Sequence, residues 1–328
     1  MAPWLLLATV LGAPGGMGEI GGPRLVPIGD QRSVPDGVVT DLAADPRGFL
    51  WIGTTQGLVR FDGYDFRRFV SDERDPGRGP GGNLVRALHV GRDGRLWIGF
   101  DRSVVSVLDP EEGRFASYRL GPLEDPRFAG ASAMALADDG RGRILVALRG
   151  AGIGIVEERP EGPRVRVIRL ARAAEPPAPE DLAHAVAAGP EGTVWIGADA
   201  GLLTLDGEDR LALAWTARDE GKPDPVYSLL WSGARLWAGT LNGRLLYREG
   251  GRVVVVEEPS PETAGLRDTI YRLLALPEAG ELWVARATGL ELRALADGRL
   301  LRRIRPEPDA RPDCAPRICG RSPATAPA

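Results

Sequence analysis

The side chains most often used in catalysis are few in this chain. It has 2 histidines, His89 and His184. Histidine is a common general acid or base, so these two residues are the natural candidates for an enzyme. Each lies in an alternating apolar stretch typical of a strand, where a histidine more often has a structural role. They precede Trp97 and Trp195 by different spacings, so their side chains are expected to point to different faces of their strands.

Acidic residues offer no better case for catalysis. Adjacent pairs of them lie in turns or on solvated surface positions, and a catalytic carboxylate pair has to converge in space. No Gly-x-Ser-x-Gly segment and no metal-ligand cluster is present. The 2 cysteines, Cys314 and Cys319, are too sparse for a zinc site. We therefore expect no catalytic residue, no metal, no cofactor, and a protein that is not an enzyme.

Ligand binding has more support, because polar and aromatic side chains recur at the ends of the expected strands. Some follow the second strand of a repeated unit, and others lie where its first strand begins. Their mixture of charges, hydroxyls and amides suits a polar small molecule or a glycan. The candidates are Thr54, Gln56, Asn83, Arg86, Asp101, Arg102, Arg149, Asp199, Tyr227, Asn242, Asp268, Tyr271 and Arg286.

The elements that must position these residues come from an internal repeat. Six copies of a short phrase of the type Leu-Trp-Ile-Gly are present, and their second residues are 42 to 50 positions apart. A period of about 40–50 residues with strand-forming cores is typical of a β-propeller. The second residues of the phrase are Trp51, Trp97, Leu145, Trp195, Trp237 and Trp283.

The first unit shows how a blade is built. Four short segments typical of strands are separated by turns that contain Gly and Asp, which predicts a four-stranded antiparallel meander. The segments are residues 38–45, 49–54, 58–62 and 66–69. The tryptophan of each second strand is expected to pack between neighbouring blades. The fold class is therefore all-β: a β-propeller of four-stranded antiparallel blades with six recognisable repeats. In such a ring, the candidate residues meet at one end of the central channel, on loops held by a rigid scaffold.

The number of blades is less certain from the sequence. Seven outer strands can be counted if residues 25–28 form one that closes the ring. Only six sets of the three inner strands of a blade are present. The ring is then either six-bladed or an incomplete seven-bladed one, and the unusual tail favours the second. We expect residues 1–22 to be a signal peptide or a disordered N-terminus, 23–305 the propeller, and 306–328 a disordered tail rich in Pro, Arg and Ala.

Charge and hydropathy limit the partners. The net charge of -4 argues against a nucleic-acid binder, which needs a basic face. Residues 3–13 form an apolar run of the length found in signal peptides and too short to span a bilayer. No other stretch approaches a membrane span. We expect a periplasmic or secreted protein with no membrane span in this chain.

The fullest copy of the unit, from Asp45 to Phe69, reads Asp-x-x-Gly, Leu-Trp-Ile-Gly-Thr, Gly-Leu-x-Arg-Phe-Asp-Gly and Phe-x-x-Phe. This pattern resembles the two-component-regulator propeller repeat, over roughly residues 25–304. The resemblance implies the periplasmic sensor region of a hybrid histidine kinase or a membrane diguanylate cyclase. No kinase or cyclase signature accompanies it here. The chain is therefore expected to be a non-enzymatic ligand-sensing domain without its own output domain, acting on a signalling partner protein.

Two alternatives remain open at this point. The chain could be a protein-interaction scaffold or a truncated fragment, as the unusual tail and the missing seventh set of inner strands suggest. It could also be a propeller-type lyase or glycan hydrolase, a reading that depends on His89 and His184.

Overall fold

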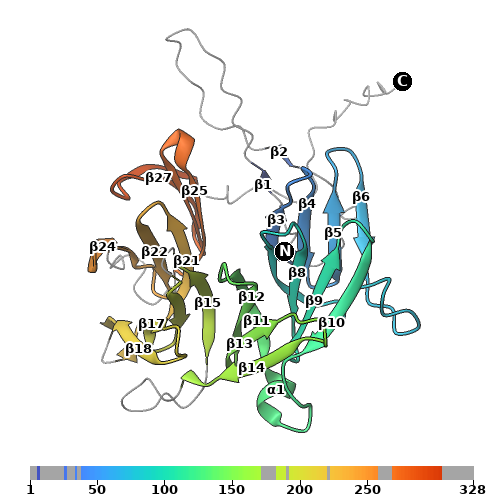
Figure 1. Cartoon of the computed structure of the whole chain (residues 1–328). Coiled ribbons are helices and arrows are strands. Elements are labelled where there is room, and N and C mark those ends of the chain that lie inside the picture. Colours follow the sequence, from blue (N-terminus) through green and yellow to red (C-terminus); the bar gives the residue numbers. More distant parts are fainter. Residues whose placement is uncertain are drawn as a thin grey trace, which may run out of the picture.

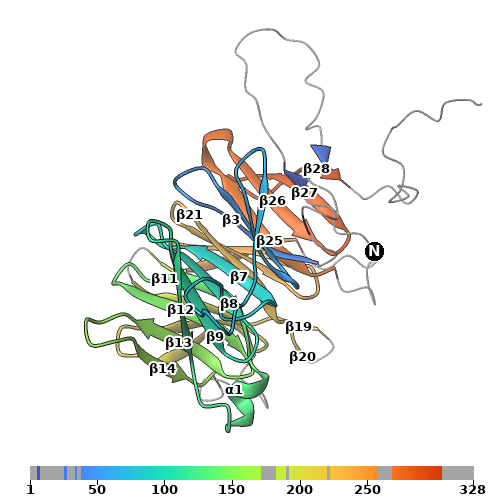
Figure 2. The same ribbon diagram turned by 90° about the vertical axis from the view of Figure 1, so that its right-hand side faces the viewer.

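Six blades of four antiparallel strands form a ring in the computed structural model (Figure 1). The structure describes residues 6–7, 26–27, 34, 38–170, 182–189, 192–219, 222–257 and 268–304. The blades follow one another along the chain, so each contacts the next around the ring (Figure 2). The protein is a six-bladed β-propeller, and each blade is built from consecutive strands.

The strands match the repeat unit by unit. Blade 1 comprises β3 (Val39–Ala44), β4 (Leu50–Thr54), β5 (Gly57–Phe61) and β6 (Phe66–Phe69). Blade 2 comprises β7 (Val85–Val90), β8 (Leu96–Phe100), β9 (Val104–Asp109) and β10 (Arg114–Arg119). Blade 3 comprises β11 (Ser132–Asp138), β12 (Arg143–Arg149), β13 (Gly152–Glu157) and β14 (Arg164–Ile168).

The second half of the ring repeats this order. Blade 4 comprises β15 (Ala183–Ala188), β16 (Val194–Ala198), β17 (Gly201–Leu205) and β18 (Leu211–Trp215). Blade 5 comprises β21 (Val226–Ser232), β22 (Arg235–Thr240), β23 (Leu245–Glu249) and β24 (Arg252–Glu257). Blade 6 comprises β25 (Ile270–Leu276), β26 (Glu281–Arg286), β27 (Gly289–Ala294) and β28 (Leu300–Ile304).

The apolar cores lie between blades. Trp51 of blade 1 packs in one cluster with Leu96 and Ile98 of blade 2. Trp237 of blade 5 does the same with Leu282 and Val284 of blade 6. Because one face of each sheet meets the opposite face of the next, alternating residues of a strand serve two different cores. The predicted inter-blade role of the tryptophans is confirmed in these clusters.

The seam between blades 6 and 1 is packed less closely than the others. Leu42 of blade 1 is 39% exposed, whereas its equivalents in blades 2, 3, 4 and 6 (Leu88, Leu136, Val186 and Leu273) are 7–9% exposed and Leu229 of blade 5 is partly buried. On the facing blade, Leu274 is 55% exposed. An ion pair joins the two inner strands across this seam, from Arg272 Nη2 to Asp41 Oδ2 at 2.6 Å.

The closing strand expected at residues 25–28 does not join blade 6. The short strand β2 (Val26–Pro27) pairs instead with β1 (Leu6–Leu7), and the outermost partner of β27 is β28. Blade 6 is thus complete with four strands of its own, and the ring has six blades. In Figures 1 and 2 the β1–β2 pair lies on the side of the ring where blades 6 and 1 meet.

Small elements also lie between the strands of the repeat in the described residues. The helix α1 (Pro126–Gly130) lies between β10 and β11, a 3-10 turn η3 (Pro277–Ala279) precedes β26, and β19 (Arg218–Asp219) pairs with β20 (Lys222–Pro223). No helix in the described part of the chain is long and apolar enough to cross a membrane. Apart from β1, the expected signal segment lies outside the described residues, as does the tail at 306–328.

Candidate functional site

Every inner strand carries a β-bulge at the same place. The register between inner and second strand shifts by one residue near the start of the inner strand in all six blades. A bulge re-aims side chains, and bulges are common beside functional sites. These bulges lie at the end of the ring where the second strands end and the third strands begin, which is the end predicted for the site. The residues at the shift are Thr40, Arg86, Met134, His184, Tyr227 and Tyr271.

Because all six bulges lie at the same place in their blades, equivalent residues can be compared from blade to blade. The residue before the shift is always apolar, and in blades 2 to 6 it is fully buried. The residue at the shift instead differs in chemical type from blade to blade. Packing therefore specifies the first position, whereas no common packing requirement explains the second. Arg86, Tyr227 and Tyr271, all predicted site residues, occupy this variable position.

His184, Asp199 and Tyr227 are brought together across the junction of blades 4 and 5. His184 Nε2 lies 2.6 Å from Asp199 Oδ1, and the imidazole stacks on the Tyr227 ring with 4.1 Å between centroids. His184 is buried, and its Nδ1 has no hydrogen-bond partner among the described residues. The histidine thus connects two predicted site residues, while the Asp199 carboxylate remains partly exposed.

Arg86 and Asp101 form the corresponding pair in blade 2. Arg86 donates from Nε to Asp101 Oδ1 at 2.8 Å and from Nη2 to Oδ2 at 3.1 Å. Burial would raise the pKa of Asp101, but the hydrogen bonds from Arg86 and Ser132 outweigh it and lower that pKa. The pair stays charged at neutral pH, and both side chains remain partly accessible.

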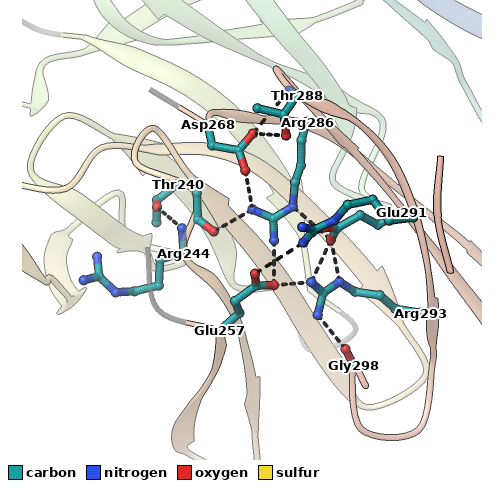
Figure 3. A network of polar contacts seen from close by, with 11 residues as sticks. Thr240, Arg244, Glu257, Asp268, Arg286, Thr288, Glu291, Arg293 and Gly298 are labelled. Atoms are coloured by element: carbon teal, nitrogen blue, oxygen red, sulfur yellow. Dashed lines mark hydrogen bonds and ion pairs between the residues drawn. The ribbon is translucent and has the colours of Figure 1, made fainter. Parts of the chain in front are cut away.

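Asp268 and Arg286 are also brought together, but in a buried network (Figure 3). Arg286 donates to Asp268 Oδ2 at 3.2 Å, to Glu291 Oε2 at 2.9 Å and to Glu257 Oε2 at 2.8 Å. Arg293 also pairs with Glu257 and Glu291. The network links blades 5 and 6, and these side chains hold one another in place.

Glu291 of this network is held ionised. Burial alone would raise the pKa of Glu291, but the charges of Arg286 and Arg293 outweigh it, together with hydrogen bonds from Arg293 and Arg303. The pKa of Glu291 therefore lies below its ordinary value of 4.5. No sequence signal identified Glu257, Glu291 or Arg293 beforehand.

The other predicted residues divide into structural and accessible ones. Thr54 is buried and donates to Gly57 O at 2.8 Å, and Asn83 Oδ1 accepts from Ser71 N at 2.8 Å. Asn242 N donates to Asp224 Oδ1 at 3.2 Å. By contrast, the accessible ones are not joined to each other by a hydrogen bond or ion pair in the described structure; they are Gln56, Arg102, Arg149 and Tyr271.

The two histidines are not brought together. His89 pairs in register with Trp97 and packs between blades, while His184 lies at the bulge of blade 4. The different spacings noted in the sequence do correspond to different positions on the strand. Within the described ranges, no group of three metal-binding side chains converges. The arrangement at the bulge end suits recognition through hydrogen bonds, charge and ring stacking.

The fold and this loop-built end define a β-propeller with a candidate recognition face. Residues 33–56 match the family model described as two component regulator propeller. This match confirms the resemblance drawn from the repeat. No curated protein matches the chain by sequence.

Solved structures share the fold at low sequence identity. The extracellular domain of the hybrid two-component system BT4673 from B. thetaiotaomicron has a TM-score of 0.64 at 18% identity, covering 83% of this chain and 33% of that one. The corresponding domain of BT3049 gives 0.58 at 14% identity, covering 87% and 44%. The chain thus spans less than half the length of these two domains. The β-propeller domain of Myceliophteria thermophila Cps50 (Swd1) gives 0.62 at 13% identity, covering 84% and 89%.

Proposed function

We propose that this propeller is the ligand-sensing part of a bacterial signal-transduction sensor located in the periplasm or outside the cell. The family match at residues 33–56 and the likeness to extracellular sensor domains support the class. In this proposal the chain binds a polar small molecule or glycan without transforming it, and a partner protein receives the signal.

The main support for a binding face at this end is the set of six bulges. Six equivalent positions have the same backbone irregularity, yet they hold a threonine, an arginine, a methionine, a histidine and two tyrosines. A rigid scaffold with variable side chains at one end is the usual design of a binding site. Tyr271 is 54% exposed and offers a ring face for stacking against a ligand.

The test screens a panel of neutral and acidic oligosaccharides and small polar metabolites for a rise in the melting temperature of the protein. Calorimetry then measures the affinity of each panel member that raises it. A binding member of the panel should lose affinity in Tyr271→Ala. The matched control is Tyr64→Ala, an exposed tyrosine in a turn at the opposite end of the ring, which should bind normally. If no panel member binds, or if both variants bind like the parent, the proposed face is wrong. Release of a cleaved product would favour the lyase or hydrolase alternative.

A further inference from the structure

An uneven distribution of charge marks the bulge end of the ring. Blades 2 and 3 carry arginines at four strand or loop ends there, and a fifth lies in the connection between the two blades. Arg102 is in the β8–β9 loop, Arg119 ends β10, Arg149 ends β12 and Arg169 follows β14, while Arg127 is in α1. All five are exposed, in a chain whose net charge is -4.

Several contacts place these arginines in one corner. Arg119 Nη1 donates to Arg102 O at 3.3 Å, which joins the first two. The Arg127 carbonyl lies beside Gly150, directly after Arg149. A hydrogen bond from Arg127 lowers the pKa of Asp125, and the nearby charge of Arg169 adds to this effect. The five side chains therefore belong to one surface, which we call the arginine corner.

Acidic groups neutralise only part of the arginine corner. Asp125 pairs with Arg127, and Asp101 pairs with the neighbouring Arg86. Glu124 lies in the same connection as α1. The structure shows no ion pair for Arg102 or Arg149 with any described carboxylate. Arg102 lies in the β8–β9 loop of blade 2, and Arg149 ends β12, the second strand of blade 3.

The backbone at Arg102 adds an independent observation. Arg102 and Ser103 have φ values of 61° and 55°, and in the described chain only Asp209 is another non-glycine residue with positive φ. The other five blades have a glycine with positive φ at the turn between the second and third strands: Gly57, Gly150, Gly201, Gly243 and Gly289. Such a conformation costs roughly 1–2 kcal/mol for a residue with a side chain, and strain of this kind concentrates at functional sites.

Local contacts hold this strained loop in place. Ser103 is fully buried, its hydroxyl donates to Phe128 O at 3.0 Å, and its N–H donates to Ala131 O at 3.0 Å. The connection that carries α1 is thus fastened to the loop that carries Arg102. The strain keeps Arg102 exposed in a turn where the other blades reach positive φ with glycine.

We infer that the arginine corner binds a ligand with two or more carboxylate or sulfate groups, held between Arg102 and Arg149. This inference rests on the proposed function and specifies the chemistry of its ligand. Guanidinium groups bind planar carboxylates and sulfates through paired hydrogen bonds. A short anionic ligand fits better than a long polyanion, because the acidic remainder of the surface would repel a chain that extends beyond this corner.

The experiment measures binding of four probes by calorimetry: an oligogalacturonate, a sulfated heparin oligosaccharide, neutral maltohexaose and succinate. The parent protein should bind at least one acidic probe, with affinity that falls as salt is raised. Arg102→Gln and Arg149→Gln should each weaken it by about tenfold or more, the size expected for losing hydrogen bonds to a charged group. Arg299→Gln, an exposed arginine in a turn at the opposite end, serves as the matched control.

The possible outcomes separate the two proposals. Binding of succinate as well as the acidic sugars would identify a small dianion as sufficient, whereas binding of the sugars alone would identify acidic saccharides. Binding of maltohexaose that depends on Tyr271 but not on Arg102 or Arg149 would overturn the arginine corner and leave the sensing function standing. Acidic probes that bind equally to both corner variants and the control would also overturn it. Melting curves of each variant establish that it is folded.

Discussion

At the residue scale, the two histidines show how register decides the role of a side chain. His89 and His184 both lie in inner strands, but only His184 occupies a bulge. His89 is placed opposite Trp97, between blades, and its Nε2 has no hydrogen-bond partner in the described structure. The same residue type therefore connects two predicted site residues in one blade and packs between blades in another.

His89 should make the fold sensitive to acid. Burial lowers its pKa below 6.5, against the opposing charges of Asp138, Asp93 and Asp41. The unfolded chain then takes up a proton before the folded one does, so stability is complete above pH 6.5 and declines as pH falls from there toward the lowered folded-state pKa. His89→Leu should remove this part of the decline, measured by urea unfolding between pH 7.5 and 5. An unchanged pH slope would contradict the assignment.

The positive φ of Arg102 should lower the free energy of unfolding. Replacing it with glycine relieves the positive φ without removing a buried contact, so Arg102→Gly should raise the free energy of unfolding by about 1 kcal/mol. Denaturant unfolding of this variant beside Arg102→Gln separates the backbone effect from the loss of charge, because glutamine retains the strain. Equal stabilities for the two variants would show that the backbone is not strained.

At the scale of elements, the seams between blades use different chemistry. Blades 1 to 5 meet mainly through apolar clusters, but the blade 5–6 seam also contains the buried network around Arg286 and Glu291. In β27 the alternation Leu290-Glu291-Leu292-Arg293 would ordinarily place the leucines inside. The structure buries Glu291 and Arg293 and leaves the leucines partly exposed. Alternation identifies the two faces of a strand but does not show which face is covered.

The network should contribute to stability only while Glu291 is ionised. Its pKa is lowered in the folded state, so its contribution is complete above 4.5 and is lost as pH falls from there. Glu291→Gln removes the most buried carboxylate of the network and leaves Arg286 with Asp268 and Glu257, and Arg293 with Glu257 alone, so it should cost about 3 kcal/mol at pH 7. The loss should shrink at pH 4, when measured by denaturant unfolding. Glu208→Gln, at an exposed turn, is the control; an equal loss at both pH values would show that charge is not the cause.

The fold was largely predictable from the sequence, and the candidate site only partly. The strands and tryptophan cores follow from alternation and from the period of the repeat, which are local and repeated six times. The bulges could not be predicted in this way. The segment Val85-Arg86-Ala87 has the alternation of an ordinary strand, but the extra residue of the bulge places Val85 and Ala87 in different cores. The partners of Arg286 were likewise hidden, since they come from two blades.

At the scale of the whole molecule, the ring is closed unevenly. At the five seams between consecutive blades the inner-strand side chains are buried or partly buried, whereas Leu42 and Leu274 at the sixth remain exposed. The Arg272–Asp41 ion pair is exposed on its arginine side and contributes little, about 1 kcal/mol. The cohesion of the ring therefore depends mainly on the five consecutive seams.

Equivalent tryptophans should consequently differ in their effect on stability. Trp237 is fully buried and packs into blade 6, so Trp237→Ala should cost about 3–5 kcal/mol. Trp283 faces the sixth seam, and Trp283→Ala should cost clearly less. Thermal or denaturant unfolding of the two variants gives the comparison, and equal losses would show that the sixth seam is as well packed as the fifth.

The position of the sixth seam has a mechanical consequence. The first strand of blade 1, β3, and the last strand of blade 6, β28, belong to the two blades that meet there. A tension applied between these strands would act first on the seam between blades 6 and 1, which is the least closely packed. It would separate these two blades and open the ring there. A ligand that draws the blades inward at the bulge end would resist that spreading. Under the proposed function, ligand binding and the force that the ring withstands would then be coupled at this one seam.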